Sequence, residues 1–221
     1  MTNEQILSYV DHTLLSPTST WKEIHAICKE AIDYKTASAC IPPSFVEQAR
    51  ITFPNLNICT VVGFPLGYST IETKITEVQS AILRGATEID TVINIGHAKM
   101  SLAYEITTEL EQLKKACKGH ILKVIIETCY LTEDEKIAMC KAVSNSGADY
   151  IKTSTGFGTA GATPEDIILF KENVSNHVKI KAAGGMSTKD DLVRFIELGA
   201  DRLGTSKAVG ILTGDNKQSG Y

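Results

Sequence analysis

The sequence predicts a single domain with the (β/α)₈ barrel fold, a TIM barrel. Short apolar runs alternate with longer segments of helical period, and a Gly-Ala pair recurs where a helix passes into the next strand. Such alternation is typical of a parallel sheet covered by helices. The chain has 221 residues, which is long enough for eight strand-helix units. We therefore expect one barrel domain over residues 1–221.

Eight runs of β-branched and other apolar residues are expected to form the strands. In chain order they are Tyr9–His12, Ser38–Ile41, Ile58–Val62, Glu88–Ile93, Leu122–Glu127, Tyr150–Thr153, Val178–Ala182 and Asp201–Leu203. Segments with apolar residues at helical spacing separate them. The expected helices are Trp21–Tyr34, Ser44–Thr52, Glu72–Leu83, Ala103–Cys117, Glu133–Asn145, Pro164–Asn173 and Lys189–Leu198.

Several of these helices begin with capping residues. Thr132 is followed three positions later by Glu135, which is the pattern of a capping box. Thr163 precedes a proline that would occupy the first helical position, and Ser187 precedes two acidic residues of a first turn. These three helix starts are expected close to the capping residues.

The Gly-Ala pairs indicate how many units the chain contains. They begin at Gly85, Gly147 and Gly199, which are 62 and 52 residues apart. If each interval spans two units, one unit has roughly 26 to 31 residues and the chain holds about eight. This count favours a closed barrel, while an open, doubly wound sheet remains the alternative fold.

Composition and charge limit the classes of function. The net charge is −4 and the basic residues form no stripe, so we expect neither nucleic acid nor a membrane surface as partner. The six cysteines form no C-x-x-C pair, which favours reduced thiols in a cytoplasmic protein. We find no secretion signal and no run long enough to span a bilayer. A small soluble ligand is expected.

Active groups of a (β/α)₈ barrel lie at the carboxyl ends of the strands. The polar residues found there are Asp11, Cys40, Asp90, Glu127, Lys152 and Lys181. Lys152 and Lys181 end successive strands, which lie roughly 5 Å apart in a sheet. Burial and a neighbouring like charge both lower the pKa of an ammonium group, and the neutral amine is a Schiff-base nucleophile. A single lysine here would more often reach solvent or pair with a carboxylate, but two converging lysines favour catalysis.

Three further acidic or basic residues lie on the same strands or on strands expected nearby. Asp90 lies within an apolar strand and needs a cationic or hydrogen-bonded partner, so it could transfer protons near the lysines. Asp11, together with Thr13, falls at the end of the first strand and could hold substrate hydroxyl groups, although an Asx turn or a cap is an equal alternative. Lys179 lies earlier in its strand than Lys181, and we expect it in an ion pair at the barrel floor.

Glycine-rich loops follow the seventh and eighth strands. Gly184 and Gly185 come after the seventh strand, and Gly204, Thr205 and Ser206 come after the eighth. The corresponding loops of such barrels commonly bind phosphate through backbone N–H groups and a helix start. The sequence thus predicts a phosphorylated ligand. Tight turns that merely need glycine are the alternative for either loop alone.

One glycine-rich segment has the spacing of a nucleotide-binding motif. Residues 156–161 match G-x-G-x-x-G, but no acidic residue ends the following strand, where Lys179 and Lys181 stand instead. The chain has no Walker A lysine motif and no H-E-x-x-H, and its five histidines show no ligand spacing. We therefore expect no metal and no other cofactor. A nicotinamide oxidoreductase and a non-catalytic phosphate-binding barrel remain the rival classes.

Six motifs resemble those of the deoxyribose-phosphate aldolase family, and together they extend over nearly the whole chain. They are Asp11–Leu15, Val62–Gly67, Glu88–Asp90, Lys123–Thr128, Tyr150–Gly156 and Lys181–Gly185. The order of Lys-Thr-Ser-Thr-Gly before Lys-x-Ala-Gly-Gly is highly specific. The resemblance implies a lyase, a class I aldolase that needs no metal. It would cleave 2-deoxy-D-ribose 5-phosphate reversibly into acetaldehyde and D-glyceraldehyde 3-phosphate, in deoxyribose phosphate catabolism.

The resemblance also implies roles for individual residues. Lys152 corresponds to the Schiff-base lysine, and Lys181 with Asp90 corresponds to a proton-relay pair. The positions that correspond to substrate contacts are Asp11, Thr13, Cys40, Thr155 and Gly156, and those that correspond to the phosphate cradle are Gly184, Gly185, Gly204, Thr205 and Ser206. Tyr221 corresponds to a mobile C-terminal tyrosine that assists proton transfer.

Two features leave questions open. Phe157 stands where some members of the family have a lysine that helps to hold phosphate, which affects the expected affinity rather than the reaction. Residues 213–221 are polar and rich in glycine, so we expect a flexible tail there. Another lysine aldolase with a different substrate remains an alternative. The oligomeric state stays open, and a homodimer is one arrangement that the sequence allows.

Overall fold

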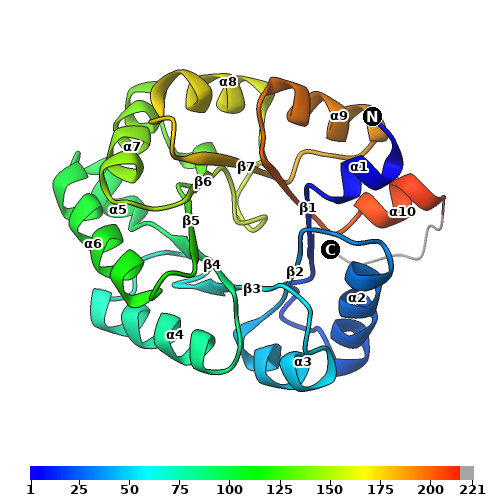
Figure 1. The fold of residues 1–221 in the computed structure, drawn as a ribbon. Helices are drawn as coiled ribbons and strands as arrows, with labels where there is room; N and C mark the ends of the chain where they lie inside the picture. The colour runs from blue at the N-terminus through cyan, green and yellow to red at the C-terminus, as the bar shows by residue number, and fades with distance from the viewer. Residues whose placement is uncertain (215–221) are drawn as a thin grey trace.

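The fold is a closed barrel of eight parallel strands that hydrogen-bond in chain order, with β1 beside β8 (Figure 1). The computed structural model describes residues 1–214. The strands are β1 (Val10–Thr13), β2 (Ser38–Cys40), β3 (Ile58–Val62), β4 (Glu88–Val92), β5 (Ile121–Ile125), β6 (Tyr150–Lys152), β7 (Lys179–Ala183) and β8 (Arg202–Thr205). All eight expected strands are present, and the closed order confirms the (β/α)₈ barrel and rules out the open, doubly wound sheet.

Helices form a ring around the barrel (Figure 1). They are α1 (Asn3–Leu7), α2 (Trp21–Asp33), α3 (Val46–Thr52), α4 (Ile71–Leu83), α5 (Ile95–Lys99), α6 (Ala103–Ala116), α7 (Glu133–Asn145), α8 (Pro164–Asn173), α9 (Lys189–Leu198) and α10 (Ala208–Thr213), with 3₁₀ turns η1 (Pro43–Phe45) and η2 (Thr128–Tyr130). The seven expected helices are confirmed. The short helices α1, α5 and α10 were not expected, because five or six residues are too few to show a helical period.

The capping predictions were correct at two helices and wrong by one residue at a third. Thr132 and Thr163 cap α7 and α8, each with a complete capping box. For α9 the cap is Thr188 rather than Ser187, and its hydroxyl accepts a hydrogen bond from the backbone N–H of Asp191 at 3.1 Å. The expected flexible tail stays a prediction: its first residue, Thr213, is the last residue of α10, and residues 215–221 lie outside the described part of the chain.

The helices cover the barrel through one apolar side. In α2 the buried residues are Ile24, Ile27, Cys28 and Ala31, which recur at helical spacing. The end of a helix turns into a strand at the Gly-Ala pairs, where Gly199 has φ +114° and closes α9 in the left-handed region. The strands are therefore buried on both faces, because their outward side chains pack against the helices and their inward side chains fill the barrel.

The strand register decides which side chains fill the barrel. Asp90 lies opposite Lys123 on β5, and Lys152 lies opposite Lys181 on β7. Because successive side chains of a strand point to opposite faces, residues two positions apart share the interior. The barrel interior therefore receives charged residues from several neighbouring strands.

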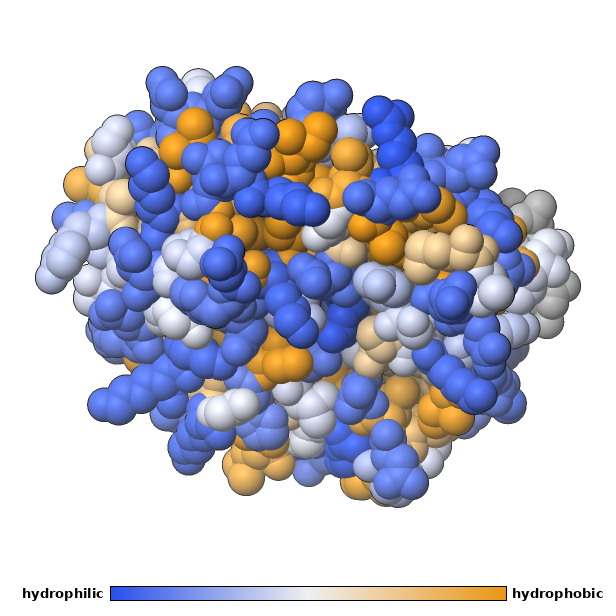
Figure 2. Space-filling view, turned by 45° about the horizontal axis from the view of Figure 1, so that its top comes forward, coloured by the Kyte–Doolittle hydropathy of each residue, from blue (hydrophilic) through white to orange (hydrophobic). Residues whose placement is uncertain are grey.

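The outer surface is predominantly polar. In the face that Figure 2 shows, hydrophilic residues cover most of the area and smaller hydrophobic areas lie between them. Of the helices in residues 1–214, none combines the length and the apolar character that crossing a membrane requires.

A buried ion pair joins two helices on the outside of the barrel. Lys74 of α4 is fully buried, and its ammonium donates to the Val92 carbonyl at 2.8 Å and contacts Glu109 of α6 at 2.6 Å. Removal of one partner of a buried pair leaves the other charge uncompensated. We expect Lys74→Ala to lower the free energy of unfolding by about 3 to 5 kcal/mol, measured by urea denaturation.

Lys29→Ala is the matched control for this change. Lys29 forms an exposed pair with Asp33 at 2.6 Å, and exposed pairs contribute little to stability. A similar loss of stability in both variants would contradict the special role of the buried pair.

Candidate active site

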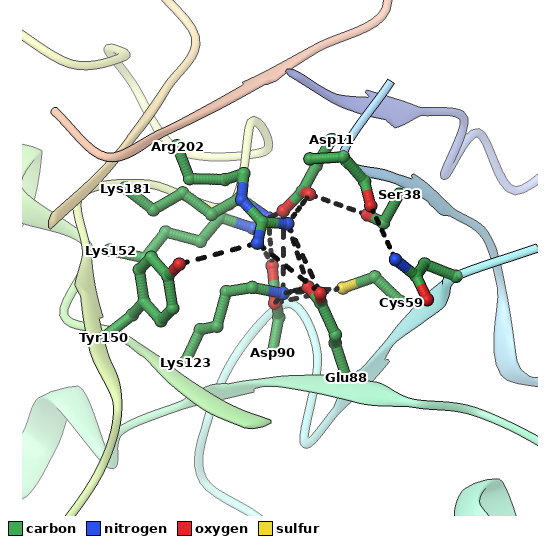
Figure 3. A network of polar contacts seen from close by, with 12 residues as sticks. Asp11, Ser38, Cys59, Glu88, Asp90, Lys123, Tyr150, Lys152, Lys181 and Arg202 are labelled. Carbon is green, nitrogen blue, oxygen red and sulfur yellow. Dashed lines mark hydrogen bonds and ion pairs between the residues drawn. The ribbon is translucent and has the colours of Figure 1, made fainter. Parts of the chain in front are cut away.

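The carboxylate of Asp90 lies at the centre of a charged network inside the barrel (Figure 3). One of its oxygens, Oδ2, accepts hydrogen bonds from the side-chain nitrogens of both Lys152 and Lys181, each at 2.7 Å. The other oxygen, Oδ1, accepts from Lys123 at 2.9 Å and from the thiol of Cys59 at 3.1 Å. The two lysines that the sequence singled out therefore meet at one atom.

A second carboxylate, that of Asp11, supports Lys181 from β1. Its Oδ2 lies 2.5 Å from the Lys181 ammonium, and its Oδ1 lies 2.5 Å from the Arg202 guanidinium. Ser38 also donates to Oδ1, at 2.6 Å. Asp11 is completely buried. Protein groups within the barrel thus engage both oxygens of this carboxylate.

Glu88, the first residue of β4, contacts two cationic side chains of the network. Glu88 lies 2.6 Å from the Lys123 ammonium and 3.1 Å from the Arg202 guanidinium. The centroid of the Tyr150 ring lies 5.6 Å from the guanidinium carbon of Arg202 and 5.8 Å from the Lys179 nitrogen. Lys179 therefore lies toward the barrel floor, as expected, but its described contact is with an aromatic ring rather than in an ion pair.

Burial and opposite charges compete in setting the pKa values of these groups. Burial raises the pKa of Asp90, but the ammonium groups of Lys123, Lys152 and Lys181 outweigh it and hold that pKa well below the usual range. Burial lowers the pKa of Lys181, but Asp11 and Asp90 outweigh it and raise that pKa above its usual value. The lowering that burial alone would cause is overcome because two carboxylates lie within 2.7 Å of the Lys181 nitrogen. Lys181 remains an ammonium ion.

Cys40 and Thr13 lie beside this network. Cys40 is fully buried in a small apolar cluster with Leu15, Cys59 and Val61. A hydrogen bond with the Cys59 thiol lowers the pKa of Cys40 below its ordinary value of 9.0. Thr13 is partly exposed, and its hydroxyl donates to the Asp11 carbonyl at 2.7 Å. The partial exposure of Thr13 leaves room for the expected substrate contact.

The glycines of the expected phosphate cradle have the backbone geometry that requires glycine. Gly184 and Gly185 have φ of +72° and +74°, and a Cβ on Gly185 would lie 2.4 Å from the Ala162 carbonyl oxygen. These residues do not stand directly at a helix start, because α9 begins at Lys189 and α10 at Ala208. Gly184 and Gly185 follow β7 as expected, whereas Gly204 and Thr205 belong to β8 and only Ser206 follows it.

The loop after β6 lies near the same end of the barrel. Gly156 has φ +91° with no atom within 4 Å of its Cβ position, and the preceding Thr155 is buried. Phe157 is 41% exposed, and its ring meets that of Phe64 edge to face at 5.4 Å. Tyr221, the other expected participant, lies outside the described residues.

Two groups of side chains in residues 1–214 have the spacing of metal ligands. They are Cys40, Cys59 and Asp90, and Asp11, Cys59 and Glu88, with ligand atoms within 4.8 Å of one another. In both groups the carboxylates already contact lysine ammonium groups. The cationic positions around these carboxylates are thus taken by side chains of the chain itself.

Several members of the network were not predicted from the sequence. Lys123, Arg202, Glu88 and Cys59 lie inside strands whose two faces are both buried, so sequence alternation does not show which side chains point inward. A signal was present for Lys123, since a lysine in the apolar run Ile121–Ile125 needs a buried counter-ion.

A lysine amine can serve as a Schiff-base nucleophile where it lies beside another cationic group, and this barrel places Lys152 beside Lys181. These are features of a lysine-dependent aldolase. The model of the DeoC/LacD family aldolases matches residues 5–219. The chain belongs to this family.

Individual relatives agree with this assignment. The chain is 59% identical over 222 residues to a deoxyribose-phosphate aldolase of Clostridium botulinum (strain Eklund 17B / Type B), with 100% of both chains covered. It is 53% identical to a deoxyribose-phosphate aldolase of Clostridioides difficile (strain 630), with 96% of this chain and 98% of the relative covered. Its fold matches a tetrameric deoxyribose phosphate aldolase from Aeropyrum pernix with a TM-score of 0.88 and 30% identity, covering 98% and 93% of the two chains.

The low pKa of Asp90 predicts a loss of stability in acid. The unfolded chain binds a proton at the ordinary carboxyl pKa of 3.8, whereas the folded chain binds it only at lower pH. The stabilisation is therefore complete above pH 3.8 and is lost as the pH falls through the folded pKa. We expect Asp90 to contribute a slope of about 1.4 kcal/mol per pH unit to the free energy of unfolding below pH 3.8.

Urea denaturation of the wild type and of Asp90→Asn between pH 6 and pH 2.5 measures this contribution. The variant should be less stable at pH 6 and should show the shallower slope in acid. Equal slopes in the two proteins would contradict the assignment.

Proposed function

We propose that this aldolase cleaves 2-deoxy-D-ribose 5-phosphate reversibly into acetaldehyde and D-glyceraldehyde 3-phosphate. The relatives described above carry the name of this activity and are covered almost from end to end. The observation that carries the proposal is the meeting of Lys152 and Lys181 at a single oxygen of Asp90. The same arrangement argues against a nicotinamide oxidoreductase, because the lysines stand where that fold places its acidic ribose-binding residue.

Lys152 is the Schiff-base nucleophile of this proposal. It ends β6, and its side chain keeps 4% exposure, whereas the side chain of Lys181 is fully enclosed. The network in Figure 3 contains three carboxylates and four cationic side chains, so it is balanced when Lys152 is neutral. The neutral amine attacks the C1 aldehyde of the open-chain sugar, and loss of water gives a protonated imine.

The protonated imine accepts the electrons of the bond that breaks. A base removes the proton of the C3 hydroxyl, the C2–C3 bond breaks, and its electron pair passes into the imine to form an enamine. D-Glyceraldehyde 3-phosphate leaves, the enamine takes a proton at C2, and water releases acetaldehyde from Lys152. Asp90 and Lys181 are the groups we assign to these proton transfers, acting through water, because Asp90 touches both lysines.

Asp11 has a different role in this proposal from the one that its motif implied. Its Oδ2 lies 2.5 Å from the Lys181 nitrogen and keeps Lys181 charged. Asp11 therefore acts through Lys181 rather than on a substrate hydroxyl group. Thr13 and Cys40 remain candidates for substrate contacts, and so do Thr155 and Gly156 on the loop after β6.

The phosphate group of the substrate is assigned to the loops after β7 and β8. Gly184 and Gly185 form a turn with positive φ, in which the Gly184 N–H donates to the Gly204 carbonyl at 3.3 Å, and Gly204, Thr205 and Ser206 belong to the neighbouring strand end and loop. Phe157 offers no charge, so these backbone groups carry more of the phosphate binding.

The setting of the reaction is also part of the proposal. The six cysteines are free thiols, which agrees with a reducing cytoplasm and a role in deoxyribose phosphate catabolism. We further propose that residues 1–221 act as one domain, that the protein needs no metal or other cofactor, and that Tyr221 assists protonation of the enamine.

Lys152 should carry the covalent intermediate. Reduction with borohydride in the presence of acetaldehyde should add the aldehyde carbons to this residue, because its amine is the assigned nucleophile. Mass spectrometry of the peptides locates the adduct. Lys152→Met is the control and should give no adduct, and an adduct on Lys181 or Lys179 would reverse the assignment.

Gly185 should control recognition of the phosphate group. Gly185→Ala places a Cβ 2.4 Å from the Ala162 carbonyl oxygen at a positive φ, so the loop must move. We expect KM for deoxyribose 5-phosphate to rise about tenfold more than KM for unphosphorylated deoxyribose, measured by steady-state kinetics.

Gly119→Ala is the matched control for this variant. Gly119 has φ +90° with no atom within 4 Å of its Cβ position, so the same backbone strain arises away from the loops. Equal rises of KM for the two substrates in Gly185→Ala would show a general packing role.

A further inference from the structure

Glu127 lies between two backbone hydrogen bonds that continue the pairing of β5 and β6 beyond the strands. Ile126 donates to the Lys152 carbonyl at 3.1 Å, and Thr128 donates to the Thr153 carbonyl at 2.9 Å. Between them Glu127 adopts φ +53° and ψ +67°, in the left-handed region. A bulky residue persists in this conformation only when its surroundings hold it there. The backbone turn gives the side chain a direction that a regular strand residue would not have.

The carboxylate of Glu127 holds the loop that follows the Schiff-base lysine. Glu127 is 2% exposed, and its two oxygens accept from the backbone N–H of Thr155 at 3.2 and 3.3 Å. The Thr155 hydroxyl donates to Oε2 as well. The same hydroxyl oxygen accepts from the backbone N–H of Phe157 at 3.0 Å. Glu127 therefore determines the path of the chain from Thr155 to Phe157.

The loop also packs directly on this carboxylate. A Cβ on Gly158 would lie 3.1 Å from Glu127 Oε1 and 2.8 Å from Cys129 Sγ. Only the backbone of Gly158 fits between these atoms. The carboxylate thus contacts the loop at both ends of the segment 155–158.

The far end of the same loop touches the proposed phosphate cradle. The Ala162 N–H donates to the Ala183 carbonyl at 3.0 Å. A Cβ on Gly161 would lie 2.6 Å from the Gly185 nitrogen. A shift of the loop at Thr155 would therefore reach Gly185 through close backbone contacts, while Lys152 stays fixed in β6.

We propose that Glu127 is a positioning residue, which fixes the loop 155–162 and so the phosphate cradle against which this loop packs. It acts through Thr155 and Gly161 and touches no reacting atom. The inference rests on the proposed function, because it assigns the controlled step to the phosphorylated end of the substrate. It predicts that a change at Glu127 weakens the holding of phosphate and leaves Schiff-base formation intact.

Glu127→Gln tests this inference, because the amide keeps the size of the side chain and loses one of the two acceptor oxygens. We expect KM for deoxyribose 5-phosphate to rise about tenfold, with kcat within about twofold of wild type. KM for unphosphorylated deoxyribose should change less than about twofold, and so should the rate of borohydride trapping with acetaldehyde. Glu127→Asp keeps the charge and withdraws it by one methylene group, and it should show the same selective rise.

Glu109→Gln is the matched control, since it makes the same chemical change at a carboxylate that is 12% exposed and pairs with Lys74 outside the barrel. It should lower stability without changing the ratio of the two KM values. Equal changes for both substrates, or a loss of thermal stability alone in the Glu127 variants, would overturn the inference. A wild-type protein that does not cleave deoxyribose 5-phosphate would reject the proposed function instead.

Discussion

The rest of the active site depends on the carboxylate of Asp90, because the side-chain nitrogens of three buried lysines share it. Lys123, Lys152 and Lys181 come from three successive strands, and each lies within 2.9 Å of this one side chain. A buried ammonium without a partner would be strongly disfavoured. The pairing of β4 to β7 and the charge of Asp90 therefore depend on each other: the barrel brings the lysines together, and the carboxylate makes their meeting stable.

Much of the fold and the centre of the site follow from local sequence. Lys152, Lys181 and Asp90 were recognisable because each is a charged residue in an otherwise apolar strand, and because motifs surround them. Arg202 and Glu88 were not, since the direction of a side chain in a strand buried on both faces depends on the closed barrel. Glu127 was expected to end a strand, but β5 ends at Ile125 and Glu127 has a left-handed backbone. Its left-handed backbone arises from contacts with Thr155, 28 positions along the chain, which no local pattern reveals.

The site separates two tasks between different parts of the barrel. The charged network is built on strands, whose register fixes the side chains within the interior. The expected phosphate contacts lie on loops, whose shape depends on glycines with positive φ and on the support of residues such as Glu127. Groups that take part in bond cleavage need a rigid frame, whereas loops tolerate the variation that changes a substrate.

The charge balance of the network links this architecture to the proposed chemistry. Asp11, Glu88 and Asp90 supply three negative charges, and Lys123, Lys181 and Arg202 supply three positive charges. With a neutral Lys152 the network is balanced, and the imine formed on Lys152 can take up one positive charge beside Asp90. Because the countercharge already lies 2.7 Å from the Lys152 nitrogen, little reorganisation is needed when that charge develops. The carboxylate that stabilises the folded barrel is thus also placed to stabilise the intermediate.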